Sequence, residues 1–427
     1  MLVSLVHASL KVVGSLILTV AILVLLVAIL LWGMAVEAKY GATVAKFGIY
    51  GSWWFNTLGL ILGINSAAAL VLRWPWKLQH LGFITPHLGL IVLLVGCFVS
   101  RHYGIEATLA VFEGQSSDLA YKGSSQHVEL DGQQHFSLRV ISADGSEKTG
   151  EPIVVPFTSG PFNWDDYREA TLEFLVWSLA HRDRGILYDH DGVRLEVLDY
   201  LSNSEIVPAA DPSGFSARAL PFDKSDSPPH LRQAYVRLTV DDRSEEFWMP
   251  CSSPDRLESL SLAIPKKLLR KSVAGKGRRV NLSFAPESFH IGYTISLRKA
   301  YRKLDPGSKL DPRTRPSFYG SEIDLVPNEY ATPSSFPKYE NLLVTLNAPL
   351  DFADPAFPGR SYRMFQSTMN GPYNPEEVGL KLGESAYLSG FTLNYDPGRG
   401  LTYVGCLLIV AGIFVAYFVK FVIPKSP

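Results

Sequence analysis

Apolar positions gather in two stretches of this chain, residues 1–100 and 401–423, and the long middle is polar and rich in turn residues. The first stretch contains three apolar runs, each long enough to cross the roughly 30 Å hydrocarbon core of a bilayer as a helix. These runs cover about residues 12–32, 54–72 and 83–100. The second stretch supplies a fourth run, so the pattern predicts a membrane protein with four transmembrane helices.

The segment between the third and fourth runs predicts a large, mainly β extracytoplasmic domain over residues 101–399, which leaves 400–427 for the fourth helix and a short cytoplasmic tail. Short alternating or β-branched runs recur there between turn signals. They are Ala107–Phe112, Phe136–Ile141, Pro152–Phe157, Val193–Tyr200, Ala234–Val240, Val280–Phe284, Ile291–Leu297, Glu322–Val326 and Leu342–Leu346. One helix is expected over Pro254–Lys271, where acidic residues come early and basic residues late. The segment is long enough for one sandwich-like domain or two smaller ones.

Two boundaries are open on the sequence alone. Val36-Glu37-Ala38 resembles a signal-peptide cleavage site, but the preceding run is longer than the usual signal core of about 7–15 residues, which favours a retained anchor. The third helix either starts with Thr85 as N-cap and Pro86 in its first turn, or starts near Leu78 and is kinked by Pro86. In both cases His87 is expected toward the cytoplasmic leaflet.

Basic residues flank the apolar runs unevenly, and the side with more of them is expected in the cytoplasm. The cytoplasmic set is then Lys11, Arg73, Lys77, Lys420 and Lys425, and the external set is Lys39 and Lys46. This predicts both termini in the cytoplasm and the large domain outside it. A bacterial inner membrane is the expected location, with a thylakoid membrane as the alternative.

Charge and cysteine content exclude several classes of protein. The 40 basic residues balance 41 acidic residues, so the basic excess of a nucleic-acid-binding protein is missing. Cys97, Cys251 and Cys406 form no Cys-x-x-Cys pair, which excludes a dithiol redox motif, a zinc knuckle and covalent c-type haem on this chain. Cys97 and Cys406 are expected to fill apolar space rather than to form a disulfide.

One histidine lies inside an apolar run: His87 is followed by uncharged, mostly apolar residues as far as Val99. A polar ring in hydrocarbon is costly, so it normally has a hydrogen-bonding partner or a functional role. On the residues alone, a hydrogen bond to a neighbouring helix and a ligand role are equally open. The other histidines lack ligand spacing and are expected at membrane edges, on the surface or in packing roles; they are His7, His80, His102, His127, His135, His181, His190, His230 and His290.

Short motifs in order along the chain carry a family resemblance. They are Ala8-Ser9-Leu10-Lys11, Ile49–Phe55, Gly82-Phe83-Ile84-Thr85-Pro86-His87-Leu88-Gly89, Gly104-Ile105-Glu106, Phe112-Glu113-Gly114, Asn347-Ala348-Pro349-Leu350, Tyr362–Ser367 and Asp396-Pro397-Gly398. Together with the four runs, they resemble the ResB/CcsB family of System II cytochrome c biogenesis proteins. The motifs cover the spans and the end of the external domain, and about residues 120–320 are unmatched.

The resemblance implies a function in cytochrome c maturation. Proteins of this family act with a ResC/CcsA-type membrane protein, which carries a tryptophan-rich haem-handling motif, to move haem across the membrane and present it to apocytochrome c for covalent attachment. His87 matches the family's transmembrane histidine, which implies a candidate axial ligand for the iron of a transient haem b shared with that partner. Trp164-Asp165 stands without further tryptophans, so the chain is expected to be a non-catalytic or co-catalytic subunit, with no catalytic residue identified.

Alternatives remain beside this interpretation. Arg73 and Lys77 are expected to act as positive-inside anchors, and contact with the haem carboxylates is their alternative role. The chain could instead be a membrane-anchored scaffold that docks apocytochrome c or the haem-handling partner without binding haem itself. A transporter subunit is a third class, although paired broken helices and a second intramembrane charge are missing from the sequence.

Overall fold

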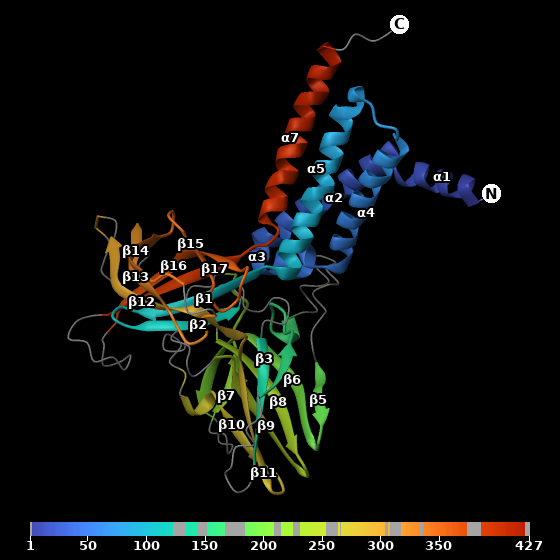
Figure 1. Ribbon diagram of the computed structural model, residues 1–427. Helices are drawn as coiled ribbons and strands as arrows, with labels where there is room; N and C mark the ends of the chain where they lie inside the picture. Colours follow the sequence, from blue (N-terminus) through green and yellow to red (C-terminus); the bar gives the residue numbers. More distant parts are fainter. Residues whose placement is uncertain are drawn as a thin grey trace. The chain divides into compact units, whose positions relative to one another are not determined.

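The computed structural model describes residues 2–122, 134–142, 152–166, 184–208, 215–224, 231–252, 264, 266–303, 306–307, 317–332, 336–373 and 386–422. They form two compact units (Figure 1). The first, the membrane unit, comprises Met1–Gly104 and Asp396–Pro427. The second, the β unit, comprises Ile105–Tyr395 and is built mainly of β-strands.

The membrane unit is helical. Its elements are α1 (Leu2–Val13), α2 (Leu16–Tyr40), α3 (Ala42–Ala45), a π-helical turn (Lys46–Tyr50), α4 (Trp53–Leu72), a 3₁₀ turn (Leu78–His80), α5 (Leu81–Tyr103) and α7 (Arg399–Val422). Within the described residues, α2, α4, α5 and α7 are long and apolar enough to cross a membrane. Figure 1 shows these four helices alongside one another, while α1 leaves the group at an angle.

The first predicted span, over about residues 12–32, is found as α2, which starts and ends later than expected. The chain breaks at Gly14, and α2 starts after Ser15, whose Oγ accepts a hydrogen bond of 3.2 Å from the Leu18 N–H. Asn65 of α4 stabilises this break, because its Nδ2 donates to the Val13 carbonyl at 2.6 Å and its Oδ1 accepts from Thr19 Oγ1 at 2.8 Å. The side-chain amide therefore satisfies backbone that the break leaves unpaired.

The helices α5 and α7 pack through two glycine stripes of seven-residue spacing, Gly82/Gly89/Gly96 and Gly398/Gly405/Gly412. A Cβ on Gly89 would lie 2.8 Å from the Gly405 carbonyl oxygen, and one on Gly405 would lie 2.6 Å from the Leu93 nitrogen. Side chains at these positions would therefore push the two backbones apart. The sequence shows both stripes, but their pairing becomes visible only in the structure.

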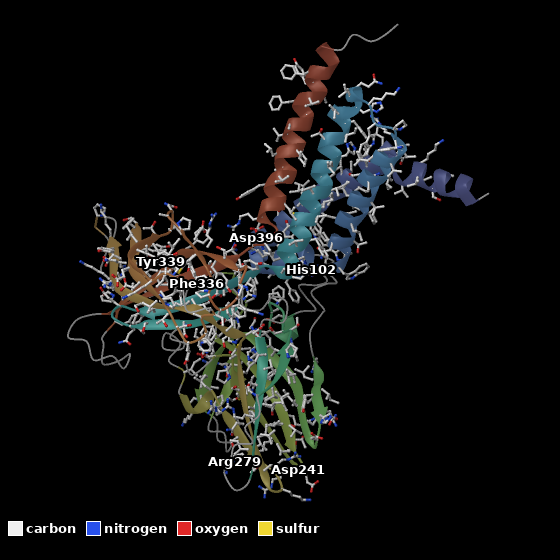
Figure 2. All side chains as sticks on the ribbon, viewed as in Figure 1. His102, Asp241, Arg279, Phe336, Tyr339 and Asp396 are labelled. Carbon is white, nitrogen blue, oxygen red and sulfur yellow. The ribbon has the colours of Figure 1, made fainter. Side chains whose placement is uncertain are left out.

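Asp396 connects the ends of these two helices (Figure 2). Its Oδ1 accepts a hydrogen bond of 3.1 Å from the Gly398 N–H, directly before α7, and one of 2.5 Å from Ser100 Oγ of α5. A carboxylate suits the start of a helix, where free N–H groups and the helix dipole favour negative charge. The Asp396-Pro397-Gly398 motif thus has a structural role at the start of α7.

The described strands of the β unit form three sheets. The largest has the order β14-β13-β12-β2-β1-β17-β16-β15, built from β1 (Ile105–Phe112), β2 (Ser116–Lys122), β12 (Ser288–Lys303), β13 (Phe318–Pro327), β14 (Tyr339–Thr345), β15 (Leu350–Ala353), β16 (Ser361–Tyr373) and β17 (Ala386–Tyr395). The first and last strands of the unit pair antiparallel from Ile105↔Tyr395 to Phe112↔Leu388. The chain therefore enters and leaves the β unit at neighbouring points.

Two smaller sheets pack against each other through aromatic side chains. One has the order β10-β11-β3-β4, built from β3 (Gln134–Ser142), β4 (Ile153–Phe157), β10 (Lys271–Ala274) and β11 (Arg278–Pro286). The other has the order β5-β6-β8-β9 with β7 on β6, built from β5 (Gly185–His190), β6 (Val193–Pro208), β7 (Phe215–Ala219), β8 (Leu231–Val240) and β9 (Arg243–Pro250). Phe136 stacks on Phe284 at 4.5 Å between ring centroids, and Phe157 contacts Tyr200 of the facing sheet at 5.8 Å.

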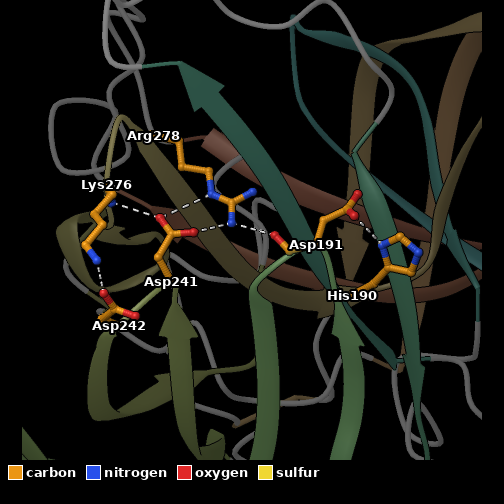
Figure 3. A network of polar contacts seen from close by, with 6 residues as sticks. All are labelled: His190, Asp191, Asp241, Asp242, Lys276 and Arg278. Carbon is orange, nitrogen blue, oxygen red and sulfur yellow. Dashed lines mark hydrogen bonds and ion pairs between the residues drawn. The ribbon is translucent and has the colours of Figure 1, made fainter.

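Three hairpin turns at one end of this sandwich are joined by a polar clamp (Figure 3). Asp241, between β8 and β9, forms an ion pair with Arg278 and accepts a 2.8 Å hydrogen bond from the Lys276 N–H. The Arg278 guanidinium also donates to the Asp191 carbonyl between β5 and β6, and the Lys276 ammonium pairs with Asp242. Figure 2 shows Asp241 near the tips of these strands. The clamp connects turns of both sheets.

The alternating pattern located strands well. Each of the nine predicted runs overlaps an observed strand, and Asp241-Asp242 forms the turn between β8 and β9, with Val240 paired to Arg243. The predicted helix over Pro254–Lys271 lies mostly outside the described residues. Its described end contains a 3₁₀ turn, Lys266–Leu268, and Lys271 already starts β10.

Candidate functional site

His87 lies in the second turn of α5, directly after Pro86. The helix starts at Leu81 after a 3₁₀ turn and contains Pro86, so its start is closer to the second of the two predicted arrangements. Pro86 is accommodated by α7, because Gly412 packs directly against the proline ring. His87 is half-buried among the described residues.

The hydrogen bond of His87 defines which ring nitrogen is free. Nδ1 lies 2.8 Å from the Phe83 carbonyl oxygen, one turn earlier in α5. A carbonyl can only accept, so Nδ1 carries the proton and neutral imidazole keeps a lone pair on Nε2. No residue that the structure describes hydrogen-bonds Nε2. Metal-binding histidines commonly have this arrangement, in which one nitrogen donates to a carbonyl and the other binds the metal.

The imidazole lies off the α5–α7 contact. Gly82 and Gly89 form that contact. Leu94, seven residues after His87, faces α4 instead, because its side chain lies 3.4 Å from the Cβ position of Gly63. Residues seven apart share a helix face, so His87 is on the side of α5 that turns toward α4. The glycine stripe holds α5 in place and leaves the histidine face free of α7.

Two side chains line up with the imidazole. The Phe83 ring lies 3.9 Å from the His87 ring, centroid to centroid, with 33° between the planes. The guanidinium of Arg73 also lies on Phe83, with its Cζ 3.6 Å from the ring centroid. Arg73 is the C-cap residue of α4, so two helices contribute to this column. The second cation of the connection, Lys77, is exposed, and its backbone N–H donates to His80 Nδ1 at 3.3 Å.

Four of the remaining histidines have local partners among the described residues: His80, His102, His190 and His290. His102, at the other end of α5, packs on Phe98 at 4.3 Å between centroids. In the β unit, His290 stacks on Tyr330 at 4.4 Å and lies 3.2 Å from an Asp118 carboxylate oxygen, while the exposed His190 pairs with Asp191. Burial lowers the pKa of His135, which favours its neutral form. His127, His181 and His230 lie outside the described residues.

Polar and aromatic residues of the β unit that could suggest chemistry have structural partners. Trp164 is buried, donates its indole N–H to the Ser159 carbonyl at 3.1 Å and packs near Phe157 and Tyr200. Burial raises the pKa of Asp354, whose Oδ1 accepts from the Gly292 and Ala356 N–H groups and so ties the loop after β15 to β12. All three cysteines are free, and Cys251 is the buried one.

The described residues contain an apolar hollow away from His87 and no multidentate metal site. Across the described residues, no group of three or more His, Cys, Asp and Glu side chains gathers to hold a metal ion. An apolar hollow of about 480 Å³ lies between α1 and α4, lined by Ser9, Leu10, Val13, Ile64, Ala67, Ala68 and Val71. His87 does not line it. A haem iron needs only one ligand from this chain when a partner supplies the other, so His87 remains the candidate.

Comparison with known proteins adds no assignment: no protein-family model matches the chain, and no curated protein matches it. The site and the motif resemblance are therefore the basis for a function. Sequence reasoning located His87 and left the role of Arg73 open between two alternatives. It missed Phe83 as a contact of both, although the spacing of four residues between Phe83 and His87 is a usable signal within a helix.

Proposed function

We propose that this chain is a membrane subunit for cytochrome c maturation, similar to ResB/CcsB proteins. It accepts haem b as cargo through His87 and, with a ResC/CcsA-type membrane protein, presents it to apocytochrome c outside the cytoplasm. The four apolar helices and the large β unit are compatible with that role. Basic residues at the α4–α5 connection, Arg73 and Lys77, favour a cytoplasmic location for the His87 end of α5.

The observation that carries this proposal is the tautomer of His87. Its Nδ1–H is engaged by the Phe83 carbonyl at 2.8 Å, so the Nε2 lone pair is available in neutral imidazole. Imidazole nitrogen is a common axial ligand of haem iron, and the carbonyl fixes the ring orientation. A histidine serving only to join helices would be expected to direct its remaining nitrogen at a neighbouring helix.

Within this function, the residues of the chain bind and orient rather than react. His87 would hold the iron through Nε2, with the opposite ligand supplied by the partner. The α5–α7 glycine contact keeps the histidine helix in place. The β unit would stand on the side where apocytochrome c is met. Haem supplies the vinyl groups for thioether formation, and no residue of this chain is assigned to that reaction.

The test is the absorbance spectrum of the full chain, purified alone and together with its co-expressed partner. We expect little haem on the chain alone and a low-spin spectrum with two nitrogen ligands in the complex. His87→Ala should abolish that spectrum and cytochrome c maturation.

A matched control is available at the other end of the same helix. His102 also packs on a phenylalanine four residues earlier, so His102→Ala removes a similar imidazole without touching the proposed ligand. The control should keep the wild-type spectrum. Normal haem content and normal cytochrome c maturation in His87→Ala would refute haem ligation by this chain and support a scaffold that docks its partners without binding haem.

A further inference from the structure

The guanidinium of Arg73 is held in place by an aromatic ring instead of an acidic partner. Its Cζ lies 3.6 Å from the Phe83 centroid, and Phe83 lies on His87 at 3.9 Å. Stacking on a ring face is a preferred geometry for arginine and leaves the N–H groups at the edge of the plane available. Phe83 thus keeps a cation at a defined place beside the imidazole.

This cation has hydrogen-bonding capacity to spare. Its side chain is exposed, and no described residue forms an ion pair or side-chain hydrogen bond with it. A guanidinium carries five N–H donors in a planar fork, and that fork matches the two oxygens of a carboxylate. The Arg73–Phe83–His87 column therefore combines a donor for a metal with a receptor for an acidic group.

We propose that Arg73 recognises a carboxylate of the same ligand that His87 holds, and that Phe83 positions both residues. The ligand class is then an iron porphyrin with free acidic side chains, and a neutral porphyrin ester is disfavoured. This inference rests on the proposed function of His87 and adds a basis for selectivity. Arg73 in this role contacts the ligand, whereas Phe83 acts through its two neighbours.

A phosphate of a lipid headgroup is the competing partner for Arg73, because arginine forks bind phosphate as well as carboxylate. The two cases differ in what they predict. A lipid anchor makes Arg73 indifferent to the acidic groups of a porphyrin. A carboxylate receptor makes it discriminate between porphyrins in any membrane, including one without anionic lipid.

The experiment compares ferric protoporphyrin IX with its dimethyl ester. Each is titrated into the complex of the full chain with its co-expressed partner in nanodiscs, with and without phosphatidylglycerol, and Soret absorbance reports binding. We expect the wild type to bind the free acid about tenfold or more tightly than the ester, the range of one charge-assisted hydrogen-bonded pair. Arg73→Gln should remove this preference in both lipid mixtures, and Lys11→Gln, a change at an exposed cation of α1, should keep it.

Phe83 is tested by the pair Phe83→Leu and Phe83→Tyr. Leucine keeps apolar volume without a ring face, so it should lower the preference for the free acid and shift the spectrum of bound porphyrin. Tyrosine keeps the ring and should restore both. Nitrogen-15 NMR of the histidine ring in the porphyrin-free chain gives an independent readout: the Nδ1–H signal should be sharp in wild type and broadened in Phe83→Leu.

The outcomes separate this inference from the function on which it depends. Equal affinity of the wild type for acid and ester, including no binding of either, overturns the role of Arg73. So does a preference that survives in Arg73→Gln. If the complex of His87→Ala with the partner lacks the low-spin spectrum of the wild type, the proposed function stands without carboxylate recognition.

Discussion

The membrane unit and the β unit are stabilised in opposite ways. In the membrane unit, α5 and α7 approach through glycines, and a Cβ on Gly96 would lie 2.7 Å from the Thr402 nitrogen. In the β unit, the core contains large rings such as Phe136, Phe284 and Tyr200, all fully buried. Water drives apolar side chains together in the β unit, but lipid gives helices no such gain, so close backbone packing replaces it.

The polar groups differ in the same sense. In the membrane unit, Asn65 is buried and uses both ends of its amide to hold the break between α1 and α2. In the β unit, the Asp241–Arg278 clamp lies at hairpin tips, partly open to water. A polar group in hydrocarbon has no water to replace a lost partner, whereas a surface clamp can exchange its partner for solvent. Three substitutions and a pH titration test that contrast, in order of decreasing effect.

Phe284→Ala should cost the most. The ring stacks on Phe136, contacts Phe157 and is fully buried, so its removal leaves a cavity between the two small sheets. We expect the free energy of unfolding of the β unit to fall by about 3–5 kcal/mol, measured by denaturant unfolding of the full chain. Val154→Ala, at a side chain that is 55% exposed, is the control and should change it by less than about 0.5 kcal/mol.

Gly405→Val tests the glycine contact of the membrane unit. The added side chain would meet Leu93 backbone atoms and the Gly89 carbonyl, so α5 and α7 must separate. Overpacking of this kind costs about 1–3 kcal/mol, which should appear as a lower midpoint of thermal unfolding in detergent. Gly59→Val on α4 is matched, because a Cβ there meets nothing within 4 Å. Equal midpoints for the two variants would contradict close packing at Gly405.

Asn65→Leu tests the side-chain amide that stabilises the break between α1 and α2. The change removes the bonds to the Val13 carbonyl and to Thr19, and should lower stability by about 0.6–2 kcal/mol. Limited proteolysis near Gly14 in nanodiscs should become faster, since the break loses its partner. Asn56→Leu is the control on the same helix, where the exposed amide donates to the Gly51 and Ser52 carbonyls of its own segment. Cleavage at the wild-type rate in Asn65→Leu would contradict a stabilising role of this amide.

Acid should weaken the Asp241–Arg278 clamp, and the resulting loss of stability should be the smallest of these effects. The hydrogen bond from Arg278 lowers the pKa of Asp241, so the carboxylate is favoured in the folded state. Its stabilisation is complete above the ordinary value of about 3.9 and is lost as the pH falls through the lowered folded-state pKa. Between about pH 6 and pH 3, thermal unfolding of the wild type should therefore shift more than that of Asp241→Asn. Asp242→Asn, at a largely exposed carboxylate, should behave like the wild type. A change in thermal unfolding with pH in Asp241→Asn as large as that of the wild type would contradict a pH-dependent clamp.

Local patterns determined much of this protein. Apolar run length located the four long helices, alternation located nine strands, and one imidazole in an apolar run singled out His87. The predicted helix boundaries were less accurate where a polar residue interrupts an apolar run. In the first run, α2 starts after Ser15, because the Ser15 hydroxyl caps the helix. These features depend on residues near one another in the chain, so they can be inferred without tertiary contacts.

Tertiary structure alone decided which residues act together. Hydropathy at Gly405, Asn65 or Arg73 is a property of one position and says nothing about which distant segment lies within a few ångströms. The pairing of the glycine stripes and the amide that holds the break at Gly14 join segments far apart in sequence, and the guanidinium on Phe83 joins the end of α4 to α5. Small and polar residues gain their roles from such partners, because their contribution comes from short distances and directed hydrogen bonds rather than from transfer out of water.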